Sequence, residues 1–320
     1  MTTFDATASS EQVIDAFASN IKGKTFVITG AGKPSIGSQM ATSLAKAAPA
    51  HILIASRTLS KVQPVLDEIH AIDSTIKTTA VQVDLTDHDS VRRAADEILA
   101  AAPKIDVLIN SAGVMAIKDY TLDKQGIELQ LSANHIGHFL LTNLLVPALV
   151  AAGFARVVNL TSSGYLVSPF RFEDWNLSDG KEYDPWTGYG QAKTANILFT
   201  YGLAQRLKQK GIAAVAVHPG YNGDTKLGAH LTWDDYAEIP AVARRNTGKE
   251  FVFEEPRFKT YTQIAATPLI AALDPELQAL APVFMQNSAV SEAAQHARDP
   301  ESVEALWRLS EELVGGEFRY

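Results

Sequence analysis

Two tyrosine–lysine pairs in this 320-residue sequence have a spacing that could support proton transfer. Tyr189 and Lys193 lie four residues apart, so in a helix their side chains project from the same face. An ammonium group there lowers the pKa of a phenol from its usual value of about 10. Tyr120 and Lys124 share the spacing but enclose Asp123 in a polar stretch, which indicates a solvated helix start. Tyr189 and Lys193 are therefore the better candidates of the two pairs for proton transfer, with Lys193 lowering the pKa of Tyr189.

Hydroxyl and amide side chains occur at two further places where chemistry would use them. Thr161, Ser162 and Ser163 follow an apolar run at 156–160. At the carboxyl end of a buried parallel strand, such a hydroxyl points into the ligand crevice. The structural alternative is that the run only begins a turn. Asn134 falls in the middle of a predicted helix, where asparagine has poor propensity, and this position therefore indicates a specific role.

A glycine-rich turn at 29–37, Thr-Gly-Ala-Gly-Lys-Pro-Ser-Ile-Gly, lies between the first predicted strand and a helix. Glycines here let backbone N–H groups approach a pyrophosphate at the helix N-terminus. The next strand ends at Arg57, and no Asp or Glu lies between Gly30 and Asp67. A carboxylate would bind the ribose 2′-hydroxyl of NAD, whereas a cation suits the 2′-phosphate of NADP. The sequence therefore predicts NADP(H), with NAD(H) as the less favoured alternative.

The candidate residues lie at the ends of apolar runs that alternate with helical segments. Continuous hydrophobicity within the runs is typical of strands buried on both faces of a parallel sheet. This alternation predicts an α/β fold with a single doubly wound, Rossmann-type parallel sheet and helices on both faces. We expect strands at 25–29, 52–55, 79–83, 105–109, 156–160 and 212–217, and helices at 38–48, 60–72, 89–101, 124–150 and 190–210.

Three segments depart from this rhythm, although none divides residues 1–320 into two domains. Residues 1–20 contain Ser-Ser-Glu-Gln before apolar positions, which predicts a capped N-terminal helical extension. Residues 221–262 are rich in charged, proline and aromatic residues, which indicates a substrate-lid insertion. The segment 300–318 has helical periodicity and is stopped by two glycines.

Composition excludes several classes of partner. A formal net charge of −8 argues against nucleic acid, because phosphate binding needs a basic face. The absence of cysteine excludes disulfides, thiolate metal sites and thiol nucleophiles. The chain lacks a run of about 18 apolar residues and a basic N-terminal leader, so we expect a cytoplasmic protein with no membrane span. His135 and His138 have no neighbouring carboxylate or thiolate, so we interpret them as structural and expect no metal.

The motifs also occur in the order found in a known enzyme family. They are Thr29-Gly30, Ile36-Gly37, Asn110-Ser111-Ala112-Gly113, Asn134, Ser162, Tyr189-Gly190-Gln191-Ala192-Lys193 and Pro219-Gly220. In this order the chain resembles the classical short-chain dehydrogenase/reductase family over residues 20–225. Its tail, with Ala-Leu-Asp-Pro-Glu-Leu at 272–277, resembles the retinol-dehydrogenase-like branch and especially its fungal members. The complete set is a specific signal, whereas each motif alone is weak.

The resemblance implies a role for each matching residue. It gives catalysis to Asn134, Ser162, Tyr189 and Lys193, with Ser163 as the alternative to Ser162 and a lysine-linked water held by Asn134. It implies cofactor contacts from Gly30, Gly32, Ser35, Ile36, Gly37, Arg57, Asp84, Leu85, Asn110, Ala112, Gly113, Tyr189, Lys193, Pro219, Gly220 and Thr225. Turn capping is the structural alternative for Asp84. The glycine turn departs from the family pattern, since it is longer and carries Ser35 where a glycine is usual, and Thr225 is slightly displaced.

The expected function is an NADP(H)-dependent oxidoreductase that interconverts a carbonyl and an alcohol by hydride transfer. Two sets of aromatic side chains indicate a small hydrophobic or aromatic substrate. The first set could line the substrate pocket, with surface loop packing as the alternative: Phe170, Phe172, Trp175, Tyr183 and Trp186. The second set lies in the predicted lid, with packing of the lid on the core as the alternative: Trp233, Tyr236, Phe251, Phe253, Phe258 and Tyr261. Because Ser35 alters the turn, a catalytically weak NADP(H)-binding sensor or scaffold stays as the alternative. A sugar-nucleotide epimerase would use the same Tyr–Lys pair but needs a larger C-terminal domain. The family resemblance allows a homo-oligomer paired through the helices that contain Asn134 and Tyr189.

Overall fold

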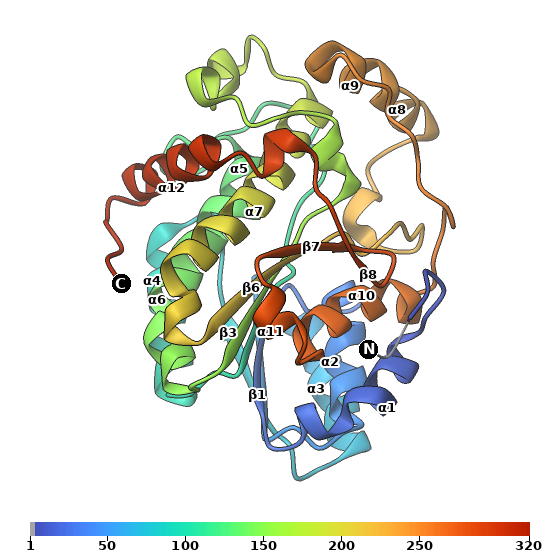
Figure 1. The fold of residues 1–320 in the computed structure, drawn as a ribbon, viewed down its shortest axis with the longest axis vertical. Helices are drawn as coiled ribbons and strands as arrows, with labels where there is room; N and C mark the ends of the chain where they lie inside the picture. The colour runs from blue at the N-terminus through green and yellow to red at the C-terminus, as the bar shows by residue number, and fades with distance from the viewer. Residues whose placement is uncertain (1–3) are drawn as a thin grey trace.

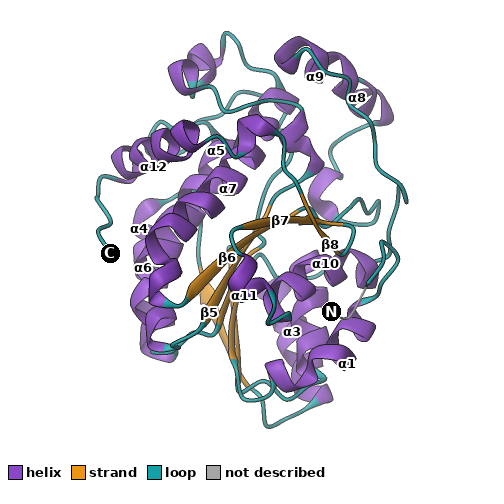
Figure 2. Ribbon diagram, viewed as in Figure 1, coloured by secondary structure: helices purple, strands orange, loops and turns teal. Residues whose placement is uncertain are grey.

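An eight-stranded sheet runs through the centre of the molecule (Figure 2), in a computed structural model that describes residues 4–320. The strands are β1 (Thr25–Thr29), β2 (His51–Ser56), β3 (Lys77–Gln82), β4 (Val107–Asn110), β5 (Ala155–Leu160), β6 (Ile212–Val217), β7 (Val283–Gln286) and β8 (Ala289–Ser291). Their order is β3-β2-β1-β4-β5-β6-β7-β8, and all neighbours are parallel except β7 and β8. This arrangement confirms the predicted doubly wound sheet, and an antiparallel strand is added at one edge.

Helices cover both faces of the sheet (Figure 1). The α-helices are α1 (Ser10–Ile21), α2 (Ile36–Ala45), α3 (Leu59–Ile72), α4 (His88–Ala101), α5 (Leu129–Leu131), α6 (Gly137–Ala151), α7 (Pro185–Leu207), α8 (Trp233–Ala237), α9 (Ile239–Thr247), α10 (Tyr261–Leu273), α11 (Leu277–Leu280) and α12 (Pro300–Val314). Helices α1, α2, α3 and α10 pack on one face, and α4, α6, α7 and α12 pack on the other. A hydrophobic core lies on each face of the sheet, and alternate residues of a strand pack into opposite cores. Val27 packs into one core, whereas Phe26 and Ile28 pack into the other.

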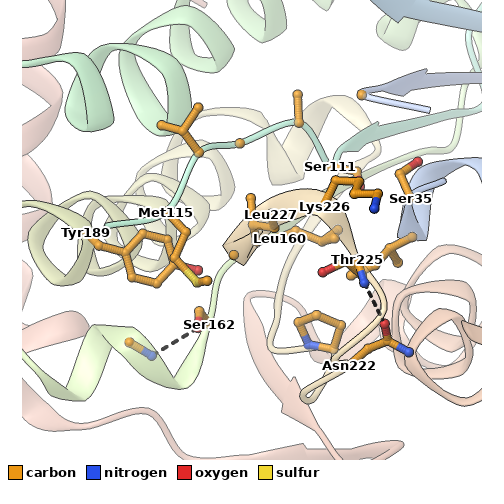
Figure 3. A pocket seen from close by; sticks show the side chains of 18 of the residues that line it. Ser35, Ser111, Met115, Leu160, Ser162, Tyr189, Asn222, Thr225, Lys226 and Leu227 are labelled. Carbon is orange, nitrogen blue, oxygen red and sulfur yellow. Dashed lines mark hydrogen bonds between the residues drawn. The ribbon is translucent and has the colours of Figure 1, made fainter. Parts of the chain in front are cut away.

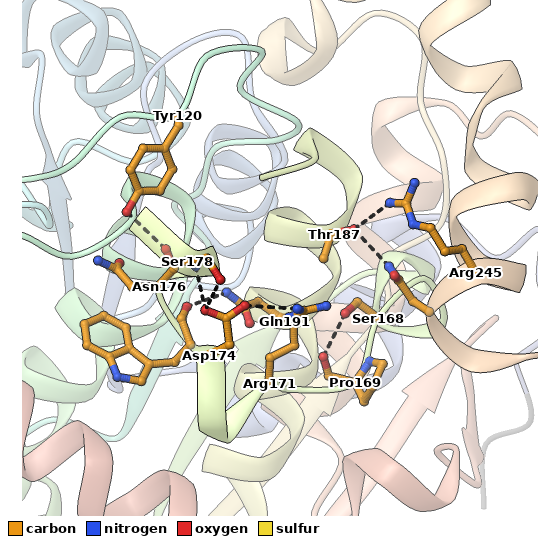
Figure 4. Close-up of polar contacts among 12 residues, drawn as sticks. Tyr120, Ser168, Pro169, Arg171, Asp174, Asn176, Ser178, Thr187, Gln191 and Arg245 are labelled. Carbon is orange, nitrogen blue, oxygen red and sulfur yellow. Dashed lines mark hydrogen bonds and ion pairs between the residues drawn. The ribbon is translucent and has the colours of Figure 1, made fainter. Parts of the chain in front are cut away.

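The six predicted strands are all present, but strands β7 and β8 and helices α8, α9, α10 and α11 were not predicted. Strands β7 and β8 are short and partly exposed, so they lack the long buried runs that marked the others. The helix predicted at 124–150 begins only at Leu129, and after the short α-helical segment Leu129–Leu131 it continues as a π-helix over Ser132–Ile136. Tyr120 lies before that start and donates to the Asn176 carbonyl at 3.0 Å (Figure 4). The predicted helix start at Tyr120–Lys124 is therefore wrong, and this stretch is a loop.

Both terminal helices have the predicted caps. Ser9 and Gln12 form a capping box at the start of α1, and α12 ends at Gly315, whose φ of 65° is left-handed. Trp307 of α12 packs between α6 and α7, with its ring centroid 5.0 Å from that of Phe139. The C-terminal segment thus completes the core on that face of the sheet.

One helical stretch in the described part of the chain, 129–151, is long and apolar enough to cross a membrane by length and composition. The most apolar window of this stretch is 83% buried inside the protein. Its side chains belong to the core between α4, α7 and the sheet. The stretch therefore has the character of a buried core helix.

Residues 221–262, called the lid segment below, follow β6, contain α8 and α9 and end in the first two residues of α10. Arg245 of α9 bonds to the hydroxyl of Thr187 at 3.3 Å, at the start of α7 (Figure 4). Arg245 also pairs with the carboxylate of Asp184, the N-cap of α7. The lid segment therefore docks on the helix that carries Tyr189.

Candidate active site

A cleft of about 1010 Å³ opens where β1, β2, β4, β5 and β6 end at their carboxyl edges (Figure 3). This edge is where open α/β sheets bind ligands. Most of the predicted site residues line it: Gly30, Gly32, Ser35, Ile36, Arg57, Asp84, Leu85, Ala112, Gly113, Ser162, Tyr189, Lys193, Pro219, Gly220 and Thr225. Three predicted residues do not line the cleft: Gly37, Asn110 and Asn134.

The glycine turn keeps the geometry of a phosphate cradle despite Ser35. Gly30 has a φ of +70°, and a Cβ there would lie 2.6 Å from the Ala112 Cα. Ser35 is the N-cap of α2, and its hydroxyl accepts from the Ser38 N–H at 3.0 Å. A serine is therefore well suited to this position, because it supplies the helix cap. Gly37 lies behind the cradle, where a Cβ would come within 2.9 Å of the Gly30 carbonyl oxygen.

The turn is tied to the strand beside it by Thr29, the last residue of β1. The Thr29 hydroxyl accepts from the backbone N–H groups of Ser111 and Ala112 at 2.9 and 3.0 Å. It also lies 2.8 Å from His138 Nε2, and His138 Nδ1 lies 3.0 Å from the Asn134 carbonyl oxygen. The arrangement is satisfied when His138 is neutral, donating from Nδ1 and accepting at Nε2, and burial lowers its pKa to about 4. His138 is thus a buried structural link.

His135 is also held by protein groups. Its Nε2 lies 2.8 Å from the Ser310 hydroxyl of α12, and burial lowers its pKa to about 3. Across residues 4–320, no group of three or more His, Cys, Asp or Glu side chains is arranged to hold a metal ion.

Three side chains lie where the ribose end of a dinucleotide would bind. Arg57 is exposed at the end of β2, and Lys61, one turn into α3, lines the same part of the cleft. Asp84 follows β3, and its carboxylate accepts from the Thr86 N–H and hydroxyl at 3.0 and 2.7 Å. Asp84 therefore caps a turn, as the structural alternative expected, while it lines the cleft. Lys61 was not predicted, although its four-residue spacing from Arg57 was a usable signal.

Ser162 and Tyr189 lie together deep in the cleft, beneath the lid segment (Figure 3). The Ser162 hydroxyl accepts from the Gly164 N–H at 3.1 Å, which leaves its own proton to donate. A Cβ on Gly164 would lie 2.7 Å from the Tyr189 ring, so the glycine permits this approach. Burial raises the pKa of Tyr189, although the contact with Ser162 acts in the opposite direction. The phenol is therefore a protonated donor in this geometry.

Lys193 lies one helical turn along α7 from Tyr189, with its ammonium nitrogen 5.6 Å from the centroid of the tyrosine ring. It donates to the Leu160 carbonyl at 3.4 Å, and burial lowers its pKa to about 8. The predicted spacing is present, but the expected lowering of the Tyr189 pKa is not, because burial of the phenol dominates. Lys193 therefore places a cationic side chain beside the Tyr189 ring.

The Asn134 side chain bonds to backbone groups of Val114 and does not reach into the cleft. Its side-chain oxygen accepts from the Val114 N–H, and its amide donates to the Val114 carbonyl, both at 3.0 Å. A Cβ on Gly113 would lie 2.5 Å from that oxygen and 3.5 Å from the Lys193 nitrogen. Asn134 thus fixes the segment after β4, which passes Lys193.

Asn110 requires a correction. Its side chain points into the sheet, where it donates to the Thr142 hydroxyl and to the Asn159 side chain at 2.9 and 2.8 Å. Only 3% of Asn110 is exposed, and the cleft begins at the next residue, Ser111. The side chain therefore ties β4 to β5 and α6 and does not line the cleft.

The predicted aromatic wall is only partly correct. Of the aromatic residues between Ser162 and Tyr189, only Trp186 lines the cleft; Phe170, Phe172 and Trp175 pack on the core. Tyr183 donates to the Ile117 carbonyl instead. The lid segment contributes Trp233, Tyr236, Phe251, Phe253 and Phe258, whereas Tyr261 lies outside. Lys226 and Met115 also line the cleft and were not predicted.

The residues present fit a nicotinamide dinucleotide. The glycine turn passes close to its neighbours, since a Cβ at Gly30 would lie 2.6 Å from the Ala112 Cα and one at Gly32 would lie 3.0 Å from the Lys61 Cβ, and it leads into the N-terminus of α2. Two cations, Arg57 and Lys61, lie at one end of the cleft. At the other end, Ser162 and Tyr189 offer hydroxyl protons. The donor set therefore matches a phosphate-bearing cofactor and an oxygen that gains a proton.

Comparisons with known proteins show the family to which the chain belongs. The short chain dehydrogenase family model matches residues 24–173. Retinol dehydrogenase 12 of Mus musculus is 36% identical over 92% of this chain and 87% of its own length. Oxidoreductase fscI of Fusarium equiseti is 35% identical over 68% of this chain and 94% of its own length. A crystal structure of an uncharacterised protein from Mycobacterium paratuberculosis, 30% identical, superimposes with a TM-score of 0.68 over 95% of this chain and 98% of that one. The chain belongs to the short-chain dehydrogenase/reductase family and is retinol-dehydrogenase-like.

Proposed function

We propose that the protein is an NADP(H)-dependent oxidoreductase that interconverts a carbonyl and an alcohol on a small, predominantly hydrophobic substrate. One observation carries the proposal: Ser162, Tyr189 and Lys193 converge at the deep end of a cleft whose other end carries Arg57 and Lys61. When bound, the nicotinamide supplies or accepts the hydride. The protein's own residues handle the oxygen and the proton.

In the reducing direction, the Ser162 hydroxyl donates to the substrate oxygen, on which negative charge develops. Tyr189 donates its proton to the same oxygen as a general acid. Lys193 stabilises the resulting phenolate, since burial leaves an ammonium there with little competing solvent. In oxidation, the same groups act in reverse.

The cofactor preference rests on charge. Arg57 and Lys61 would hold a 2′-phosphate through charge-assisted hydrogen bonds. Along the β2–α3 connection, where a carboxylate would hold a 2′-hydroxyl, the chain offers no Asp or Glu. These features support NADP(H) over NAD(H).

The substrate class rests on the lining beneath the lid segment. Apolar side chains surround Tyr189 there: Met115, Val167, Trp186, Leu227, Leu231, Tyr236, Ile239, Phe251 and Phe253. Such a lining favours a hydrophobic or aromatic compound with one carbonyl at its buried end. The sensor alternative depended on Ser35 in the glycine turn. Because Ser35 caps α2, its presence is no longer a reason to propose a sensor.

The test is NADPH consumption with a panel of aldehydes and ketones, compared with NADH. We expect a kcat/KM preference for NADPH and a loss of at least ~100-fold in kcat for Tyr189→Phe, because a general acid is removed. Cofactor affinity should change little in that variant. A clear preference for NADH would reject the cofactor assignment. Binding of NADPH without turnover on any carbonyl would favour the sensor.

A further inference from the structure

A buried polar chain lies beside the cleft, on the side of β6. It begins at His218, the residue before Pro219-Gly220. The backbone N–H of Ser163 donates to His218 Nδ1 at 3.1 Å. Because Nδ1 accepts this bond, the ring proton is on Nε2, which donates to Glu254 Oε1 at 2.6 Å. Only 1% of His218 is exposed, so solvent does not compete for these bonds.

The chain continues from the lid segment into the turn between β7 and β8. The Asn287 side-chain amide donates to Glu254 Oε2 at 3.1 Å. Lys259, which is only 3% exposed, donates from its ammonium to Asn287 Oδ1 at 2.6 Å. Each side chain therefore determines which atom of its neighbour donates and which accepts, from Lys259 to the Ser163 amide.

The two ends of the lid segment meet at the same place. The Lys259 N–H donates to the Tyr221 carbonyl at 2.8 Å, and the Asn222 side chain donates to the Lys259 carbonyl at 2.8 Å. The Ser163 hydroxyl lies 2.6 Å from the Tyr221 hydroxyl. Ser163 thus contacts Tyr221, the first residue of the lid segment, through its side chain and contacts His218 through its backbone. It is also the residue next to Ser162.

We propose that His218 and Glu254 are positioning residues that couple docking of the lid segment to the orientation of the Ser162 hydroxyl. Glu254 selects the His218 tautomer with the proton on Nε2, as a carboxylate does for a histidine in other sites. The Nδ1 lone pair then holds the Ser163 N–H, and with it the turn from Ser162 to Gly164. If the lid segment leaves, His218 loses the group that selects this tautomer. The inference rests on the proposed role of Ser162 in carbonyl reduction.

The electrostatics agree with an ionised Glu254. Burial alone would raise its pKa, but the hydrogen bond from His218 and the nearby Lys259 leave that pKa lowered. Removing the charge therefore disturbs both neighbours. In Glu254→Gln, an amide that keeps its oxygen toward His218 must turn its NH2 group toward the Asn287 NH2 group, so two donors face each other.

This mismatch gives a selective test. Adding Asn287→Asp to Glu254→Gln restores an acceptor for the glutamine amide and keeps one for Lys259, so one carboxylate has moved along an otherwise intact chain. Glu250→Gln is the matched control, because Glu250 is an exposed lid carboxylate paired with Arg244. For each full-length variant, kcat, KM and the hydrogen-exchange rate of the Ser163 amide are measured with NADPH present.

We expect Glu254→Gln to lower kcat by about 10-fold or more and to speed Ser163 exchange by a similar factor, with KM for NADPH within about 3-fold. The double variant should return both to within about 3-fold of the parent, and Glu250→Gln should change neither. Equal behaviour of Glu254→Gln and Glu250→Gln would overturn the inference, as would a kcat loss with unchanged Ser163 exchange. A folded double variant without recovery would also overturn it.

Failure of the proposed function gives a different result. If the parent protein reduces no carbonyl, the proposed activity fails. The exchange arm still decides whether Glu254 holds the Ser163 amide through His218, since it needs no turnover.

Discussion

Replacing Thr29 by valine should separate the hydroxyl of this residue from its volume. Thr29 is fully buried at the end of β1, and its one hydroxyl serves the N–H groups of Ser111 and Ala112 and the Nε2 of His138. Valine keeps the shape and removes all three bonds. A buried polar group left unpaired costs about 1–3 kcal/mol, so three partly compensated losses amount to about 3–5 kcal/mol.

Thr29→Ser is the matched control because it keeps the hydroxyl and removes one methyl group. That change should cost about 1 kcal/mol, the value for one buried methylene. Urea unfolding at pH 7 measures both, with the change in midpoint multiplied by the slope m. The valine variant should also bind NADPH more weakly, since Ser111 and Ala112 line the cleft. If the two variants differ by less than about 1 kcal/mol, the hydroxyl does not hold the turn as argued, because its lost bonds would exceed that.

Three further perturbations test other parts of the structure. Arg57→Ala should raise KM for NADPH by about 10-fold or more and leave KM for NADH nearly unchanged, because a charged hydrogen bond to the 2′-phosphate is lost; steady-state kinetics with both cofactors measures this. Burial lowers the pKa of Lys193 from 10.5 to about 8, so the unfolded chain binds more protons between these values and the free energy of unfolding should rise from pH 8 to pH 10. In Lys193→Met, the free energy of unfolding should rise by roughly 2 kcal/mol less than in the parent between pH 8 and pH 10, as measured by urea unfolding at both pH values. The same pH dependence of unfolding in parent and variant would contradict a buried ammonium at Lys193. Trp307→Ala should cost about 3–5 kcal/mol in the same assay, because the ring fills the space between α6, α7 and α12; Arg308→Ala, on an exposed position of the same helix, is its control.

The sequence was most informative where local pattern decides structure. Apolar, β-branched runs predict β1, β2, β4, β5 and β6 because these strands are buried on both faces, whereas β3 at the sheet edge is only partly buried. The Tyr189–Lys193 spacing predicts one helix face because α7 is regular there. Ser9 and Gly315 predict helix ends because capping depends on neighbouring residues alone.

The errors arise where tertiary contacts decide the outcome. Asn110 carries a family motif, but whether its side chain faces the cleft or the sheet depends on Thr142 and Asn159, both distant in sequence. His218 and Glu254 are separated by 36 residues and carry no spacing signal. The π-helix at 132–136 also has no amino-acid composition that would distinguish it from an α-helix in the sequence. Such features require the folded chain.

That π-helix links the glycine turn to the surroundings of Lys193. The Asn134 carbonyl accepts from His138 Nδ1, and the opposite ring nitrogen receives the Thr29 hydroxyl at the glycine turn. The Asn134 side chain bonds both backbone groups of Val114, beside Gly113 and Lys193. The Asn134 carbonyl therefore fixes the end of β1 through His138, and the Asn134 side chain fixes the backbone at Val114, which passes the lysine. Since these links have fixed donor and acceptor senses, a shift at the cradle would also move the surroundings of Lys193. The Thr29→Val variant should for this reason lower kcat as well as cofactor affinity, even though Thr29 does not line the cleft.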